Sequence, residues 1–421
     1  MSPPQPHFLE LTFQLQGHIA PALRLAKRLL AVAPDVLVTF STTEDAHGRM
    51  FPAKPTEHGG GDDGGAEEDD GRLEFLPFSD GTEAGDDARP LDARIASFHA
   101  AGACGAAEIV GALAARGRPV TRVVYTLLLP WAAAVARERG VPSALYWIQP
   151  AAVLSIYHHY FHGHASAIAE HRHDLSFVVE LPGLSPQMIG DLPSFLTDST
   201  DPSDVFHSFF TTIRDLIETL DKEAPKATVL VNTCQEMEVG ALAAVGAYDV
   251  LPVGPVLPSR DESGSSIIKL QDDAEYMEWL DAKPANTLWC GLCGFGMEWL
   301  DTKLANSVVY VFYRSLPTMV REQLDELLLG LEERGRPYLE GHHDCAGVDD
   351  VAEMEKRLKN GIAMMEWCNQ VQVLSHASVG VLLDARTTGR ARSWRAWRVV
   401  CWLLAQVDSS GGLQLRVVEV R

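Results

Sequence analysis

The sequence has little positive charge: 35 Lys and Arg stand against 57 Asp and Glu, a formal net charge of -22 over 421 residues. Such an acidic surface disfavours nucleic acid and anionic membranes as general partners. The sequence also lacks the basic start and small-residue cleavage site of a signal peptide, and no run approaches the roughly 20 apolar residues of a membrane helix. These absences predict a soluble, cytoplasmic protein with reduced thiols.

Paired metal ligands are also missing from the sequence. The seven Cys are scattered, and the one close pair, Cys290 and Cys293, has no second Cys or His pair at a zinc spacing. Six His crowd residues 157–173, but carboxylates are sparse there and no HExxH pattern occurs. We therefore predict no metal site, and we interpret residues 157–173 as a helix and loop beside a substrate cleft.

What the sequence does contain is a strand, a tight turn and a helix near its start. Apolar residues from His7 to Leu15 predict a buried strand, and Leu and Ala recur at helical spacing after Pro21, which we expect in the first helical turn. His18 lies in the turn, at the carboxyl end of the strand, where open α/β sheets bind ligands. A neutral imidazole there can take a proton from a bound hydroxyl. The alternative is a turn histidine that only bonds backbone.

Strands and helices go on alternating through the first half of the chain. Further strand patterns occur at 36–40, 73–81, 120–128 and 143–148. Helical stretches separate them, so the predicted fold class is α/β with a doubly wound parallel sheet. The length favours two or three domains, and Pro-rich then polar residues near 250–266 mark a boundary. We predict an N-terminal domain 1–258, a linker 259–270 and a C-terminal domain 271–421.

The second half carries two irregular features. MEWLDAKPAN at 277–286 recurs as MEWLDTKLAN at 297–306, which is typical of a copied or misjoined segment because a solenoid needs at least about three stacked units. Residues 384–421 are rich in Arg and Trp, unlike the acidic chain before them, and show no clean period. We predict an aberrant, out-of-frame tail there. Contact with RNA or a membrane surface is the alternative.

Several motifs resemble those of one family, the plant UDP-sugar-dependent glycosyltransferases of small molecules. They are QGHI (16–19), TFSTTEDAH (39–47), FLPFSDG (75–81), VVYTLLLPWAAAVA (123–136), LPGL (181–184), VLVNTCQEME (229–238), VLPVGPVLPS (250–259) and EWCNQVQVLSHASVG (366–380). The similarity is greatest to the branch that glucosylates auxin-like carboxylates or anthocyanin 5-hydroxyls. The resemblance implies a GT-B fold of two Rossmann-like domains, the N-terminal one holding the acceptor and the C-terminal one, here incomplete, holding the UDP-sugar. It also implies transfer with inversion, no metal, no cofactor besides UDP-glucose as donor substrate, and a monomer.

The resemblance assigns roles to individual residues in the acceptor half. His18 stands in the position of the catalytic base. Thr126 stands where many relatives have an Asp that holds this His, and we carry it over as a catalytic candidate. A Thr hydroxyl can orient an imidazole but cannot stabilise imidazolium by charge, so the base is expected to be weaker.

The donor half departs from the family pattern. Ser315, Trp367 and Gln370 are the donor-binding candidates, with Trp367 stacking on uracil, but Arg314 replaces a glycine next to the diphosphate. The signature box fails after Gly380, and its diphosphate His falls on Ala385. We attribute the failure to a frameshift. The sequence also ends before the family's closing helices.

These observations predict a UDP-glycosyltransferase that transfers glucose to a flavonoid, anthocyanin or auxin-like acceptor. The departures in the donor half leave open whether the activity of this chain is impaired. The alternative is a catalytically inactive small-molecule-binding remnant or the product of a damaged gene. A nicotinamide dehydrogenase is disfavoured because no GxGxxG follows the first strand.

Overall fold

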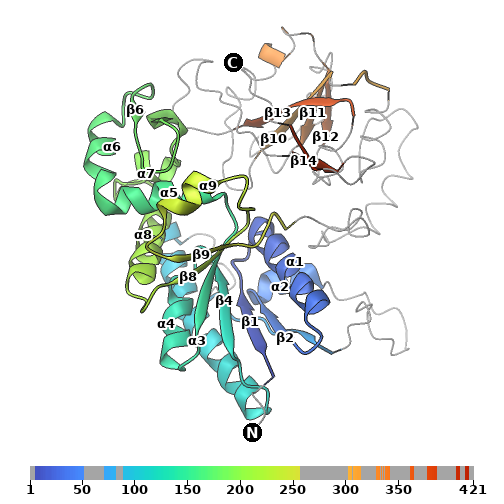
Figure 1. Cartoon of the computed structure of the whole chain (residues 1–421), viewed down its shortest axis with the longest axis vertical. Helices are drawn as coiled ribbons and strands as arrows, with labels where there is room; N and C mark the ends of the chain where they lie inside the picture. The colour runs from blue at the N-terminus through green and yellow to red at the C-terminus, as the bar shows by residue number, and fades with distance from the viewer. Residues whose placement is uncertain are drawn as a thin grey trace. The chain divides into compact units, whose positions relative to one another are not determined.

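The computed structural model describes most of the N-terminal half of the chain and short segments beyond it. The described residues are 5–51, 71–81, 89–256, 302–305, 307–313, 329–331, 333, 335, 337–341, 361–364, 377–385, 404–407 and 413–416. The chain divides into two compact units, Met1–Pro258 with Ile267–Gln271, and Ser259–Ser266 with Asp272–Arg421 (Figure 1). The predicted limits of the linker, 259–270, stay a prediction.

The first unit is built on a parallel sheet in the order β3-β2-β1-β4-β5-β8-β9. Its strands are β1 (His7–Leu11), β2 (Leu37–Ser41), β3 (Leu73–Phe75), β4 (Arg122–Thr126), β5 (Ser143–Trp147), β8 (Thr228–Val231) and β9 (Asp249–Pro252). The central strands are buried on both faces, which explains their unbroken apolar runs. The order reverses between β1 and β4, so the carboxyl ends of these two strands flank the point where such sheets bind ligands.

Helices cover both faces of this sheet. They are α1 (Gln16–Val32), α2 (Glu44–Met50), α3 (Leu91–Ala115), α4 (Trp131–Glu138), α5 (Ala151–His159), a π-helical turn (Tyr160–His164), α6 (Ala165–His171), α7 (Ser194–Thr197), α8 (His207–Asp221) and α9 (Val239–Ala244). A short hairpin of β6 (Val178–Val179) and β7 (Gln187–Met188) precedes a 3-10 turn (Ile189–Asp191). One core lies under α1 and α2 and contains Ile19 and Phe40. The other core contains Leu113 and Trp147.

The predicted start of the first helix is wrong. We expected a turn at Gln16–His18 and a helix from Pro21, but α1 begins at Gln16 and Pro21 lies inside it. The amide groups of His18 and Ile19 both donate to Leu15 O, at 2.8 and 3.0 Å, so the residues assigned to the turn form the first helical turn. The apolar period that we used starts later because Gln16, Gly17 and His18 have no apolar side chain.

Two further corrections concern α3 and α8. By length and composition the 25-residue helix α3 could cross a membrane, contrary to our expectation. Core helices pass the same test, and the Phe98 and Leu113 side chains of α3 are buried in the core of the sheet. Apolar residues at helical spacing within 205–224 predict an amphipathic helix with one buried stripe. The stripe is confirmed on α8 at Phe209, Ile213, Leu216 and Leu220, but its first residue, Val205, precedes the helix and is exposed.

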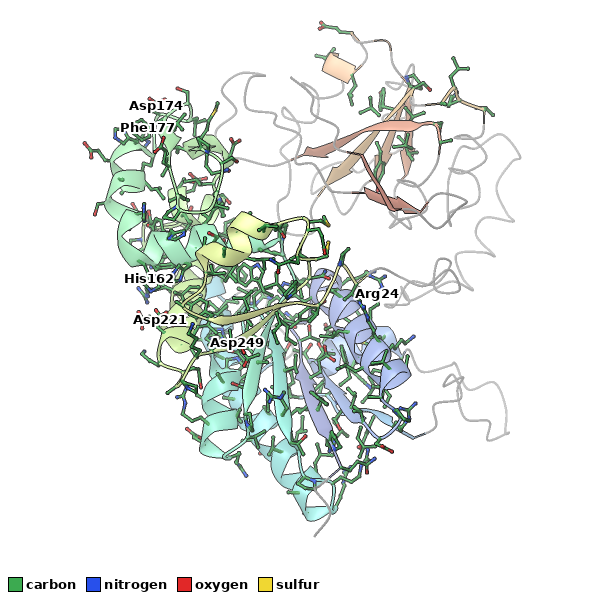
Figure 2. All side chains as sticks on the ribbon, in the orientation of Figure 1. Arg24, His162, Asp174, Phe177, Asp221 and Asp249 are labelled. Carbon is green, nitrogen blue, oxygen red and sulfur yellow. The ribbon has the colours of Figure 1, made fainter. Side chains whose placement is uncertain are left out.

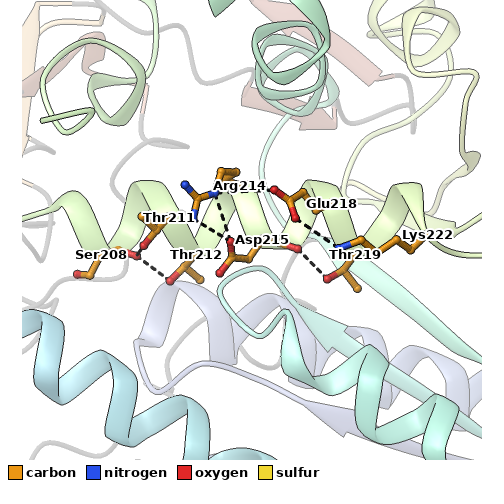
Figure 3. Close-up of polar contacts among 8 residues, drawn as sticks. All are labelled: Ser208, Thr211, Thr212, Arg214, Asp215, Glu218, Thr219 and Lys222. Carbon is orange, nitrogen blue, oxygen red and sulfur yellow. Dashed lines mark hydrogen bonds and ion pairs between the residues drawn. The ribbon is translucent and has the colours of Figure 1, made fainter. Parts of the chain in front are cut away.

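Polar contacts occupy the outer face of α8, as Figure 3 shows. Arg214 pairs with Asp215 at 3.3 Å, and Lys222 pairs with Glu218 at 3.4 Å. The Thr219 hydroxyl donates to the backbone carbonyl of Asp215, one turn earlier, at 2.7 Å. This alternation of solvated and buried faces fixes which side of α8 packs on the unit.

The second unit repeats the strand arrangement on a smaller scale. Its strands are β10 (Val308–Tyr313), β11 (Tyr338–Gly341), β12 (Gly361–Met364) and β13 (Val379–Ala385), all parallel, in the order β12-β11-β10-β13. The apolar runs at 308–316 and before residue 383 predict strands, and β10 and β13 confirm them. In the tail predicted to be aberrant, β14 (Leu404–Val407) and β15 (Leu413–Arg416) pair antiparallel.

Candidate active site

His18 lies where the sequence places it, beyond the carboxyl end of β1 and in the first turn of α1. The residue keeps partial solvent exposure, but its Nδ1 atom is buried and has no hydrogen-bond partner among the described residues. Burial lowers the pKa of His18 to about 3. The imidazole is therefore neutral at physiological pH, and the same burial makes it a weaker base than a solvated imidazole.

Thr126, the last residue of β4, is fully buried and sits on the other side of the switch point. Its hydroxyl accepts the backbone N–H of Phe13 at 3.2 Å and donates to the Thr12 hydroxyl at 3.4 Å. Within the described residues the hydroxyl thus bonds the segment after β1 and not the imidazole that we expected it to orient. Thr126 is therefore linked to His18 indirectly: its hydroxyl bonds the backbone of Phe13, which lies between β1 and α1.

The ring of Phe13 is the direct neighbour of the imidazole, with centroids 5.3 Å apart and planes inclined by 58°. Its other side meets Phe98 edge-on at 5.2 Å, and Phe98 is 6.4 Å from Trp131. Phe13, Phe98 and Trp131 thus form a row of aromatic rings, the aromatic wall, which runs from the segment after β1 through α3 to α4. Sequence reasoning missed Phe13 and Phe98, although the position of Phe13 directly before the turn was a usable signal.

A glycine on α3 allows this wall to close. A Cβ atom built on Gly102 would lie 2.6 Å from Cζ2 of Trp131, closer than side chains tolerate. The helix and the indole therefore approach each other in a way that only glycine permits. Trp131 Nε1 is buried and has no partner among the described residues, so a polar atom is left next to the apolar rings.

The motif that ends in Glu238 has a structural role at the same edge of the sheet. Both carboxylate oxygens of Glu238 accept backbone N–H groups at the start of α5, from Ala151 and Ala152, each at 2.9 Å. A carboxylate there satisfies two orphan donors and complements the helix dipole. The Glu238 carboxylate therefore caps the N-terminus of α5.

The six histidines of residues 157–173 lie on α5, the π-helical turn, α6 and the residues directly after it. His158 Nδ1 is 3.2 Å from the Tyr248 hydroxyl, which donates to Asp221 at 2.8 Å. His162 Nε2 is 3.1 Å from the same carboxylate; Figure 2 labels His162 and Asp221. Desolvation and the neighbouring His162 lower the pKa of His158 to about 4. The described residues contain no group of three or more ligands that could hold a metal ion.

The donor-binding candidates Ser315, Trp367 and Gln370 lie outside the described residues. The strands that lead to the predicted donor loops are described. β10 ends at Tyr313, which pairs in register with Ala385, the last residue of β13. Ala385, which stands where the family has its diphosphate-binding histidine, therefore lies at the end of β13. β13 is the strand at which the order of the second sheet reverses, beside β10.

Comparison with known proteins identifies the class. The crystal structure of Os79 from O. sativa in complex with UDP matches with a TM-score of 0.64 and 25% identity, covering 90% of this chain and 76% of that one. The predicted α/β fold class is thus confirmed: the chain has the GT-B architecture of UDP-glycosyltransferases. No protein-family model matches the chain.

Curated relatives identify the family. The crocetin glucosyltransferase of Gardenia jasminoides is 35% identical, over 89% of this chain and 74% of its own length. An anthocyanidin 3-O-glucoside 5-O-glucosyltransferase of Perilla frutescens is also 35% identical, over 88% of this chain and 74% of its own length. The chain belongs to the plant UDP-glycosyltransferases, enzymes that take a UDP-sugar as donor and need no cofactor.

Proposed function

We propose that this glycosyltransferase moves glucose from UDP-glucose to a small-molecule hydroxyl or carboxylate, of flavonoid, anthocyanin or auxin-like type, with inversion. The observation that carries the proposal is the neutral His18 imidazole at the switch point of the first sheet. The names of the two curated relatives support a glucosyl donor and an acceptor of this kind. From the sequence alone we further propose a cytosolic monomer.

The proposed reaction is a single displacement. The acceptor oxygen forms a bond to the anomeric carbon while the bond from that carbon to the UDP oxygen breaks. A hydroxyl acceptor gives its proton to His18, and UDP leaves with the negative charge. Because an alcohol is a poor nucleophile at neutral pH, a base within hydrogen-bond reach raises the rate by about 10²–10⁴-fold.

The test is direct. Purified protein is incubated with UDP-glucose and either a flavonol or indole acetate, and glucoside formation is followed by mass spectrometry. We expect product from the wild-type chain and loss of the flavonol glucoside with His18→Ala. His47→Ala is the matched control, because that ring packs on Phe51 and Phe75 in the same unit. Equal activity of His18→Ala and wild type would contradict the assignment.

A non-catalytic small-molecule-binding protein is the second candidate. It is favoured by residues of the donor half, since Arg314 and Ala385 occupy positions where the family has a glycine and a histidine. Loss of one charge-stabilising donor costs roughly 2.7–4 kcal/mol of transition-state stabilisation in comparable sites. The same incubation decides between the two: no glucoside, together with no UDP-induced rise in melting temperature, supports the binding protein.

A further inference from the structure

The hydroxyl of Thr126 ties β4 to the segment that leads to His18. It accepts the Phe13 N–H at 3.2 Å and donates to Thr12 Oγ1 at 3.4 Å, and all three residues are buried. The Thr12 hydroxyl in turn contacts Phe13 O at 3.4 Å. Both backbone polar atoms of Phe13 are thus held by threonine hydroxyls. The peptide at Phe13 is more closely restrained than its place in a loop suggests.

Phe13 passes this restraint on to the imidazole. Its ring lies between those of His18, at 5.3 Å, and Phe98, at 5.2 Å. The buried Nδ1 atom of His18 takes no hydrogen bond from the described residues, so the ring is held by packing. Because an interior is densely packed, a shift of the Phe13 backbone moves or loosens the imidazole.

We infer that Thr126 is a positioning residue, which holds His18 for proton abstraction through the backbone and ring of Phe13, while no carboxylate of the described residues hydrogen-bonds the buried imidazole Nδ1. The inference rests on the proposed function for its catalytic consequence. A base supported only by packing receives no charge stabilisation when it becomes imidazolium. The site therefore favours acceptors that need little help to lose a proton: carboxylates, already ionised at neutral pH, and acidic phenols.

The two acceptor types separate positioning from general structural support. Thr126→Val keeps the side-chain shape and removes the hydroxyl, while Thr126→Ser keeps the hydroxyl. The matched control is Thr121→Val at the opposite end of β1, where the Thr121 hydroxyl accepts the His7 N–H at 2.8 Å and donates to His7 O at 3.0 Å. Both valine variants remove one threonine-to-backbone bridge, but only the first touches the His18 segment.

We expect Thr126→Val to lower kcat for a phenol acceptor by about 10–100-fold, in line with the cost of a misplaced catalytic group. Its kcat for a carboxylate acceptor should stay within about two-fold of wild type, because no proton has to be removed. Thr126→Ser should restore phenol turnover, and Thr121→Val should change neither. An equal loss for both acceptors, or no loss for either, overturns the inference.

A spectroscopic measurement on the His18 ring tests the inference without depending on enzyme turnover. In protein carrying ¹³C-labelled histidine, the His18 ring protons feel the ring current of Phe13 and should shift or broaden in Thr126→Val. They should stay in place in Thr126→Ser and Thr121→Val. An unchanged His18 signal in Thr126→Val overturns the inference even if the wild-type chain makes no glucoside, whereas a missing glucoside alone overturns only the proposed function.

Discussion

Glu10 is a carboxyl group in the middle of β1 with no hydrogen-bond partner for its Oε1 atom among the described residues. The residue is 1% exposed and is flanked in register by Phe40 and Val124, both part of the core under α1. Burial raises the pKa of this carboxyl well above its ordinary value of 4.5. We predict that Glu10→Leu stabilises the protein and removes a pH dependence of its stability.

The sign follows from proton binding. Above the unfolded pKa the unfolded chain has released the Glu10 proton while the folded chain still holds it, so stability falls as the pH rises towards the raised folded pKa. One proton gives a slope of up to about 1.4 kcal/mol per pH unit within that window. A buried polar group without a partner costs about 1–3 kcal/mol in addition. The gain from Glu10→Leu should therefore be larger at about pH 8 than at about pH 5.

Urea unfolding at the two pH values, followed by Trp fluorescence, measures this difference. Glu10→Gln is the control, because it removes the titration and keeps a buried polar group. We expect its pH dependence to match that of Glu10→Leu and its stability to be lower. If Glu10→Leu is less stable than wild type at both pH values, or if its advantage does not grow with pH, the carboxyl is satisfied and the reasoning fails.

Three further predictions concern packing, capping and the pH profile. Gly102→Ala should destabilise the protein by about 1–3 kcal/mol, because its Cβ meets the indole at 2.6 Å, whereas Gly111→Ala on the same helix has room and should be neutral or stabilising in thermal unfolding. Glu238→Gln should cost about 0.5–2 kcal/mol by weakening the cap of α5, and the exposed Glu236→Gln should cost nothing measurable. If His18 is the base, kcat for a phenol acceptor should fall on acidification only near pH 3, because the pKa of His18 is about 3. A fall near pH 6.5 would show that the ring is not buried in solution.

The sequence predicts the first sheet well because its signal is strong and local. β4 and β5 lie within a residue or two of the predicted ends, since a strand buried on both faces must be apolar at every position. The position of His18 beyond β1 followed for the same reason: once the strand is placed, its carboxyl end is placed as well. The family motifs added the roles of these residues.

What the sequence could not predict are contacts between residues far apart in the chain. Thr126 lies 113 residues from Phe13, and its hydroxyl bond to that amide depends on the register of β1 against β4. An unbroken apolar run, such as that of β4, has no alternation that would identify the residue opposite each position. The prediction of the helix start failed for a related reason. Gln16, Gly17 and His18 show no apolar period, and the first turn is defined by backbone bonds to Leu15.

The two sheets together limit where a loss of activity can arise. In each of them the order of the first four strands reverses at the same place, between β1 and β4 and between β10 and β13. Ala385 still pairs with Tyr313 at the carboxyl end of β13, so the backbone of this strand continues past Gly380, where the sequence leaves the family pattern. A defect in UDP binding would then come from the side chains at these strand ends and not from the sheet itself. A chain that binds UDP weakly but keeps His18 and Phe13 in place should still bind the acceptor, which acceptor titration in the absence of UDP-glucose can measure.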